Sequence, residues 1–265
     1  MPYETLDVRR EDALLWLTLD RPHALNAMNP TLVNELRDFF SRLPEQPEVR
    51  VVILRGRGRA FCAGLDLKEG GGDVGTGGVS GTLRLQRRIS ELVMLMRRAP
   101  QPIIACVHGA AAGGGFALAL GADVRLAGES ARMNAAFIRI GLSACDVGVS
   151  YFLPRMVGAS VASELMLTGR FIHAERAERI GLVSCVVPDD DLEAEARLLA
   201  GEMLATSPLG LRLTKECLAM NLDAGSLEQA IALEDRNQVL CTQSPDVREG
   251  MLAFLQKRRP EYGDV

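Results

Sequence analysis

The sequence predicts an α/β fold with a largely parallel sheet and a helical C-terminal region. Strand patterns alternate with helical patterns along the first 190 residues, which is typical of layered α/β proteins. The apolar runs at 49–54 and 102–107 indicate strands that are buried on both faces of a sheet. From residue 190 onward the pattern is purely helical. We therefore expect a core at residues 1–190 and a helical, oligomer-forming region at 191–265.

The chain begins with two strands and a helix. Residues 3–8 and 13–19 alternate in polarity as strands do, with a charged turn between them. Asn29 and Pro30 mark the start of a helix, because Asn is a favoured cap residue and Pro fits the first helical turn. Apolar side chains then recur at helical spacing as far as Phe40.

The middle of the chain combines glycine-rich and apolar segments. The glycines of 68–81 predict local mobility, and an amphipathic helix follows at 83–98. The apolar stretch 102–124 approaches the roughly 20 residues that span a bilayer. However, it contains a histidine and several glycines, so a buried strand, a glycine turn and a short helix at 115–122 explain it better than a membrane span. Further helices are predicted at 149–157, 160–167 and 174–180, and further strands at 124–127 and 183–187.

Composition argues against several classes of protein. The 265 residues include 30 Lys and Arg and 34 Asp and Glu, a net charge of −4, which does not suggest a nucleic-acid partner. The six cysteines lie far apart without a CxxC pair and there are three histidines, so we expect neither a disulfide framework nor a metal site. The first residues are polar and charged, unlike a signal peptide, and we expect a cytoplasmic protein.

Two glycine-containing loops each follow a predicted buried strand. One is FCAGLDLK at 61–68, and the other is GAAAGGGF at 109–116, which leads directly into a helix. Glycines there leave backbone N–H groups bare at a helix N-terminus, which suits an oxyanion or a phosphate. A close contact between helix and sheet that needs no ligand is the alternative. The Lys and Ser or Thr of a Walker loop are absent.

These loops and their surroundings resemble the crotonase (enoyl-CoA hydratase/isomerase) superfamily over nearly the whole chain. The matching segments, in family order, are 19–36, 51–69, 101–127, 153–188 and 249–262. The resemblance implies a crotonase-like spiral of ββα units, a helical C-terminal trimerisation region, and often a dimer of trimers. It also implies an acyl-CoA thioester as substrate, with coenzyme A present as part of that substrate and not as a permanently bound cofactor.

The resemblance also implies the residues of the site. The backbone N–H groups of Leu65 and Gly114 would hold the thioester oxyanion. Positions that follow coenzyme A in the family correspond here to Arg21, Ala24, Ala63, Asp66, Leu67, Phe254 and Lys257. The last two correspond to the pair that approaches the adenine end, often from a neighbouring subunit. For Arg21 and Lys257, the alternative interpretation is a solvated surface charge.

The sequence departs from the hydratase pattern at two positions. Where a hydratase of this superfamily has two glutamates, this chain has Ala117 and Phe137. One carboxylate would activate water and the other would deliver a proton, so their loss removes the expected hydration machinery.

Asp146 is the remaining acidic candidate. Its spacing to Gly158 matches a catalytic aspartate of dienoyl-CoA isomerases and 4-chlorobenzoyl-CoA dehalogenases. Measured from Gly141, however, the loop is one residue longer, and the histidine of the dehalogenases corresponds to Ser90. The alternative role for Asp146 is an N-cap for a helix that starts near Val147. Weaker candidates for chemistry are Glu69, Cys62 and Cys145.

The sequence thus favours an enzyme that isomerises an acyl-CoA double bond, with Asp146 moving the proton. A thioester or carbon–carbon bond hydrolase that uses Asp146 as a base is one alternative. A catalytically silent acyl-CoA-binding protein is another, supported by the loss of both glutamates.

Overall fold

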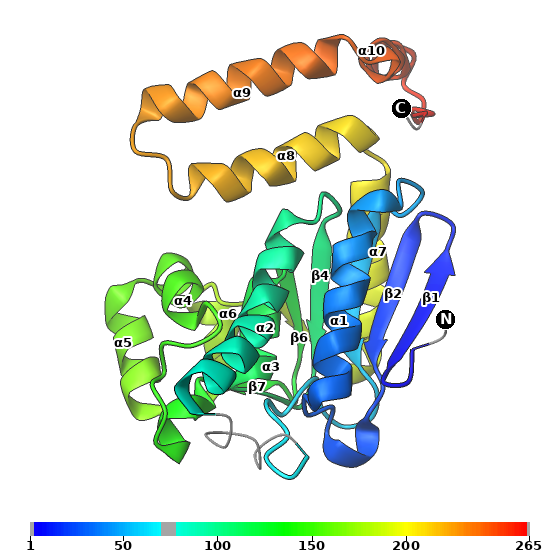
Figure 1. Cartoon of the computed structure of the whole chain (residues 1–265). Coiled ribbons are helices and arrows are strands. Elements are labelled where there is room, and N and C mark those ends of the chain that lie inside the picture. The colour runs from blue at the N-terminus through cyan, green and yellow to red at the C-terminus, as the bar shows by residue number, and fades with distance from the viewer. Residues whose placement is uncertain (1–2, 70–77, 264–265) are drawn as a thin grey trace.

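A six-stranded sheet forms the centre of the molecule in the computed structural model, which describes residues 3–69 and 78–263 (Figure 1). Its strands lie in the order β1 (Leu6–Glu11), β2 (Leu14–Leu19), β3 (Val51–Gly56), β4 (Ile103–Val107), β6 (Val124–Gly128) and β9 (Cys185–Val187). The β1–β2 pair is antiparallel and the other pairs of this sheet are parallel. The prediction of a largely parallel sheet is therefore confirmed.

A second, smaller sheet contains β5 (Ala110–Ala112), β7 (Arg132–Asn134) and β8 (Ile172–His173). Twice along the chain, a strand of the large sheet is followed by a strand of the small sheet and then by a helical segment. The first unit is β4, β5 and α3 (Gly114–Gly121), and the second is β6, β7 and the 3-10 helix η4 (Ala136–Ile140). This repeat is the spiral of ββα units that the resemblance implies.

Helices cover both faces of the large sheet. On one face, α1 (Pro30–Arg42), α2 (Gly78–Arg98) and α3 contribute to the main core, which includes Phe40 and Leu92. On the other face, α7 (Leu192–Leu204) packs three buried side chains against β2, β3, β4 and β6. The boundary predicted near residue 190 thus falls just before a helix that packs on the sheet.

The remaining helices surround the site or extend the molecule. They are η1 (Pro22–Ala24), η2 (Leu43–Glu45), α4 (Val149–Val157), α5 (Ala159–Thr168), α6 (Ala174–Arg179), η5 (Asp189–Asp191), α8 (Pro208–Asn221), α9 (Leu227–Thr242) and α10 (Pro245–Gln256). Helices α8, α9 and α10 lie beyond one end of the sheet (Figure 1) and bury few side chains. Within 3–69 and 78–263, no helix has the length and hydropathy to cross a membrane.

The predicted boundaries were furthest from the structure at the first strand and at the start of α2. The first strand begins at Leu6 and not at residue 3, because the N–H groups of Glu4 and Thr5 donate to the Glu35 carboxylate of α1 and not to a strand. Helix α2 begins at Gly78, five residues before the predicted start, although its buried side chains are all further along. The predicted mobility of 68–81 falls largely on residues 70–77, which lie outside the described residues. The predicted cap of α1 is confirmed, because Asn29 Oδ1 accepts from the Leu32 N–H at 2.9 Å.

Candidate active site

A cavity of about 240 Å³ lies where the two glycine loops meet the N-terminal half of α2. Its walls are mainly apolar, with Met28, Leu67, Leu85, Ile89, Phe137 and Leu142 among the lining residues. Among the described residues that line it, Asp146 is the one ionisable side chain. A mostly apolar cavity with one convergent acidic group is the usual form of a small-molecule site.

The two glycine loops pack so closely that side chains are excluded between them. A Cβ on Gly115 would lie 2.1 Å from the Cys62 carbonyl oxygen, and one on Gly64 would lie 2.7 Å from that of Ala112. Gly113 caps α3 with a φ of +52°, a conformation that favours glycine. The close contact proposed as an alternative for these glycines is therefore present. It also brings the backbone of the two loops together at the cavity.

The N–H groups of Leu65 and Gly114 lie on this shared wall. Both residues line the cavity, and the same Cβ on Gly64 would lie 3.6 Å from the Gly114 nitrogen. Neither N–H donates to an acceptor in the described part of the chain. Gly114 also begins α3, where the first turn leaves donors unpaired and the helix dipole favours negative charge. Two free donors at one cavity can stabilise a developing oxyanion.

Asp146 also lines the cavity and is half-buried. Its Oδ1 accepts from the Val147 N–H at 2.8 Å and from Gln86 Nε2 at 2.5 Å. Desolvation by burial raises the pKa of the carboxyl group, and these two hydrogen bonds oppose the rise only in part. The capping alternative was wrong, because α4 starts at Val149 and its cap residue is Gly148.

Both positions at which the resemblance implies hydratase glutamates are apolar and buried in this chain. Ala117 is fully buried within α3, and Phe137 is 8% exposed and lines the cavity. The cavity therefore lacks a second carboxylate at either position.

The residues expected along coenzyme A fall into two groups. Ala63 and Leu67 line the cavity beside Leu65, and Ala24 is half-buried in η1. Arg21 and Asp66 instead form a buried ion pair, with 3.0 Å between Nη1 and Oδ2 and side chains 4% and 9% exposed. Arg21 also donates to the Ala27 carbonyl and pairs with Glu69 at 2.8 Å.

This ion pair holds the shape of the 63–69 loop. Burial alone would raise the pKa of Asp66, but the Glu69 N–H, the Arg21 guanidinium and the Lys68 N–H hold it below its usual value. The Glu69 carboxylate forms an ion pair with Arg21 and accepts a hydrogen bond from Asn29, so it is already paired with these two side chains. Burial raises the pKa of the Cys62 thiol to about 12, which keeps it protonated and unsuited to act as a nucleophile.

Phe254 and Lys257 lie at the C-terminal end of α10, far from the cavity in this chain. Figure 1 places α10 at the end of the molecule opposite the start of α2. The Phe254 side chain is 84% exposed and Lys257 is exposed as well. Within one chain, these two residues therefore do not lie near the other predicted site residues.

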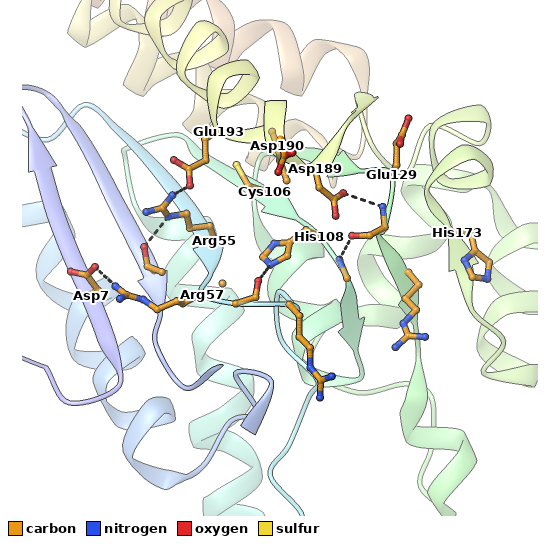
Figure 2. Close-up of a pocket in the computed structure, with 18 of the residues that line it drawn as sticks. Asp7, Arg55, Arg57, Cys106, His108, Glu129, His173, Asp189, Asp190 and Glu193 are labelled. Carbon is orange, nitrogen blue, oxygen red and sulfur yellow. Dashed lines mark hydrogen bonds and ion pairs between the residues drawn. The ribbon is translucent and has the colours of Figure 1, made fainter. Parts of the chain in front are cut away.

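A larger polar cavity, of about 1080 Å³, lies on another part of the surface and is shown in Figure 2. Several of its charged groups are already paired: Arg57 with Asp7 at 2.6 Å, and Arg55 with Glu193. His108 Nε2 contacts the Gly58 carbonyl oxygen at 2.8 Å. Arginines and carboxylates are mixed around this cavity, so its wall has no predominant charge that would attract a charged ligand. Within the described residues, no cluster of His, Cys, Asp and Glu could hold a metal ion.

Sequence reasoning missed Gln86, the side chain that contacts the Asp146 carboxylate. Gln86 lies on α2 one turn before Ser90, and its amide nitrogen is 3.4 Å from the Ser90 hydroxyl. The sequence did contain an indication of this role, because Gln86 and Ser90 directly follow the apolar residues Leu85 and Ile89 in the predicted helix. They therefore lie near the helix face that packs on the core.

The chain is similar to known proteins along nearly its whole length. The family model described as enoyl-CoA hydratase/isomerase matches residues 9–265. A protein of Mycobacterium bovis named a probable enoyl-CoA hydratase is 39% identical over 252 residues, covering 94% of this chain and 88% of its own. The 1,2-epoxyphenylacetyl-CoA isomerase of Escherichia coli is 34% identical over 252 residues and 95% of each chain.

Solved structures show the same likeness in three dimensions. The crystal structure of an enoyl-CoA hydratase from Bacillus anthracis superposes with a TM-score of 0.93 and 31% sequence identity. The match covers 99% of this chain and all of that one. An enoyl-CoA hydratase from Mycobacterium smegmatis gives a TM-score of 0.91 at 32% identity, over 97% of this chain and 98% of the other. The crotonase-like fold is thus shared along the whole length.

Proposed function

Because the chain belongs to the enoyl-CoA hydratase/isomerase family of the crotonase superfamily, we propose that it moves a carbon–carbon double bond within an acyl-CoA thioester. The proposal depends mainly on one observation. Asp146 is the one ionisable group on the described wall of the cavity, and the free N–H groups of Leu65 and Gly114 lie on the same wall. One base and one oxyanion site suffice for a double-bond shift.

In this mechanism the thioester oxygen accepts hydrogen bonds from Leu65 and Gly114. The Asp146 carboxylate removes a proton from a carbon of the acyl chain, and the electron pair moves to the thioester oxygen as a dienolate. The same carboxyl group then returns the proton to the other end of the conjugated system. One C–H bond breaks and one forms, so the mass of the substrate is unchanged. The two N–H groups bind most strongly when the charge develops, which lowers the barrier.

The raised pKa of Asp146 suits this role. Burial destabilises the carboxylate, which makes it a stronger base than an exposed aspartate. Hydration would need a second acid–base group, and the two positions that carry it in hydratases hold Ala117 and Phe137. The isomerase among the relatives shows that the family also performs rearrangements without net addition of water.

We further propose that coenzyme A extends from the cavity along Arg21, Ala24, Ala63, Asp66 and Leu67. Ala63 and Leu67 support this path because they border the cavity beside Leu65. Phe254 and Lys257 would reach the adenine end from a neighbouring subunit, since they lie at the end of α10, which Figure 1 shows at the end of the molecule opposite the start of α2.

A trimer, or a dimer of trimers, is the assembly we propose. Helices α8–α10 leave many large apolar side chains in water, a feature that marks interaction surfaces. Leu218, Leu227, Val239, Met251, Phe254 and Leu255 are each more than 60% exposed in the single chain.

A panel of 2-enoyl-, 3-enoyl- and dienoyl-CoA esters tests the proposed reaction. Isomerisation leaves the mass unchanged and alters the ultraviolet absorbance as the double bond enters or leaves conjugation with the thioester. Addition of one water to the product mass would overturn the proposal in favour of hydration. Release of free coenzyme A would indicate a hydrolase, and tight binding without turnover would indicate a silent acyl-CoA-binding protein.

A further inference from the structure

Two hydrogen-bond donors converge on a single oxygen of the Asp146 carboxylate. The Val147 N–H and Gln86 Nε2 both donate to Oδ1, at 2.8 and 2.5 Å. No donor from the described residues contacts Oδ2. The two oxygens are therefore not equivalent: Oδ1 is held, and Oδ2 keeps its lone pairs for a proton.

Gln86 is itself held by the long helix α2. Its neighbour Ile89 belongs to the buried face of that helix, and Leu85 packs against the same core. The amide nitrogen of Gln86 lies between Asp146 Oδ1 and the Ser90 hydroxyl. An ionised carboxylate accepts hydrogen bonds only, so the amide NH₂ group must be the part that faces it.

Building on the proposed function, we propose that Gln86 is a positioning residue that fixes Asp146 so that Oδ2 transfers the proton. A carboxylate held at one oxygen by two donors from different elements has little freedom to rotate. Orientation of this kind lowers the barrier to a proton transfer without contact with the substrate. Gln86 acts on the reaction through Asp146.

The effect of Gln86 on the pKa of Asp146 can be measured in the pH dependence of kcat. The elements around Asp146 present Thr82, Gln86 and Ser90 from α2, Phe137 and Ile140 from η4, and Leu65 and Leu67 from the first loop. None of these is ionisable, and the adjacent Cys145 is exposed. Burial raises the pKa of Asp146, and the Val147 and Gln86 hydrogen bonds oppose that rise. Loss of the Gln86 donor therefore moves the pKa of Asp146 further upward.

Gln86→Met tests the proposal, because methionine keeps the length of the side chain and removes the donor. We expect kcat to fall by about tenfold, the size of one hydrogen bond to a charged group, while KM changes little. The acidic limb of the kcat profile should move to higher pH. Gln86→Glu should move it further, because a second carboxylate would then face Oδ1. Arg87→Met, at the exposed next position of α2, is the matched control and should behave like the wild type.

The outcomes separate this inference from the proposed function. If Gln86→Met keeps the wild-type kcat and pH profile while Asp146→Asn is inactive, the positioning role is wrong and the proposed function stands. If Asp146→Asn is fully active, the proposed function fails and the positioning role fails with it. A fall in kcat for Gln86→Met without any movement of the pH profile would indicate a packing defect and overturn the inference. Thermal unfolding of each variant checks that the fold is retained.

Discussion

The ring of Phe137 packs against Gly113, the residue that precedes Gly114, the proposed oxyanion donor. A Cβ on Gly113 would lie 3.5 Å from Cε1 of Phe137. Phe137 places an apolar ring at the position where the resemblance to the crotonase superfamily implies a glutamate in hydratases. It also forms part of the cavity wall that an acyl chain would meet.

Phe137→Ala should broaden the choice of acyl chain. Removal of the ring enlarges the cavity, so we expect kcat/KM for branched or ring-bearing acyl-CoA esters to rise relative to that for straight chains. We also expect a loss of about 3 kcal/mol in the free energy of unfolding. Phe39→Ala, in the core part of α1, is the control for stability alone. An unchanged preference in Phe137→Ala would show that this ring does not border the bound acyl group.

Arg21→Met should destabilise the fold strongly at neutral pH. The change leaves the Asp66 carboxylate buried without its guanidinium, a loss of about 3–5 kcal/mol in the free energy of unfolding measured with urea. Arg10→Met is the matched control, because the Arg10–Glu48 pair is about half exposed and contributes at most about 1 kcal/mol. Equal losses in the two variants would contradict the structural role of the Arg21–Asp66 pair.

The loss in the free energy of unfolding caused by Arg21→Met should depend on pH. The pKa of Asp66 is held below its usual value in the folded chain, so the pair contributes stability above the usual carboxyl pKa. That contribution is lost as pH falls through the folded-state pKa. The difference in stability between wild type and Arg21→Met should therefore narrow in acid.

Leu255→Glu should weaken self-association. Leu255 is 77% exposed on α10, and a charge there would have to be buried in the proposed subunit interface. Size-exclusion chromatography with light scattering should show a trimer or hexamer for the wild type and smaller species for the variant. Leu167→Glu, equally exposed but on α5, is the control. A wild-type monomer at micromolar concentration would contradict the proposed assembly.

Lys257→Gln should weaken binding of the acyl-CoA ester without slowing the chemistry. The change removes one charge and keeps most of the side chain, and we expect a loss of about 1–2 kcal/mol, the scale of one charge-assisted contact to phosphate. KM should rise and kcat should stay near the wild-type value, because the contact is remote from the reacting carbons. Arg259→Gln, an exposed cation on the same segment, is the control. A lower kcat with unchanged KM would rule out this placement of Lys257.

The long helices and strands could be predicted from the sequence because their apolar residues recur with a clear period. The bounds of α4 at Val149–Val157 agree with the prediction, and the Asn29 cap of α1 is confirmed. The small sheet could not be predicted, because its strands contain three residues or fewer and show no alternation. Their pairing depends on neighbours that lie far away in the sequence.

The candidate site was predictable in its backbone and only partly in its side chains. The glycine loops indicated free N–H groups at a helix N-terminus, and the family resemblance assigned the oxyanion donors to Leu65 and Gly114. The direction of Asp146 could not be predicted, because its loop is one residue longer than in the isomerases and dehalogenases. The Arg21–Asp66 and Gln86–Asp146 contacts join residues 45 and 60 positions apart, and no local pattern indicates them.

The most direct test of the proposed mechanism is the turnover of Asp146→Asn on an enoyl-CoA ester that the wild type isomerises. Burial raises the pKa of Asp146, so the folded chain favours its protonated form, and the stability this gives is lost as pH rises through that pKa. The neutral asparagine should therefore leave thermal stability at neutral pH unchanged or slightly higher. We predict a fall in kcat of about 10²–10⁴, the contribution of a positioned acid–base group, with the fold intact. Wild-type turnover by Asp146→Asn would contradict the proposal that this carboxylate carries the proton.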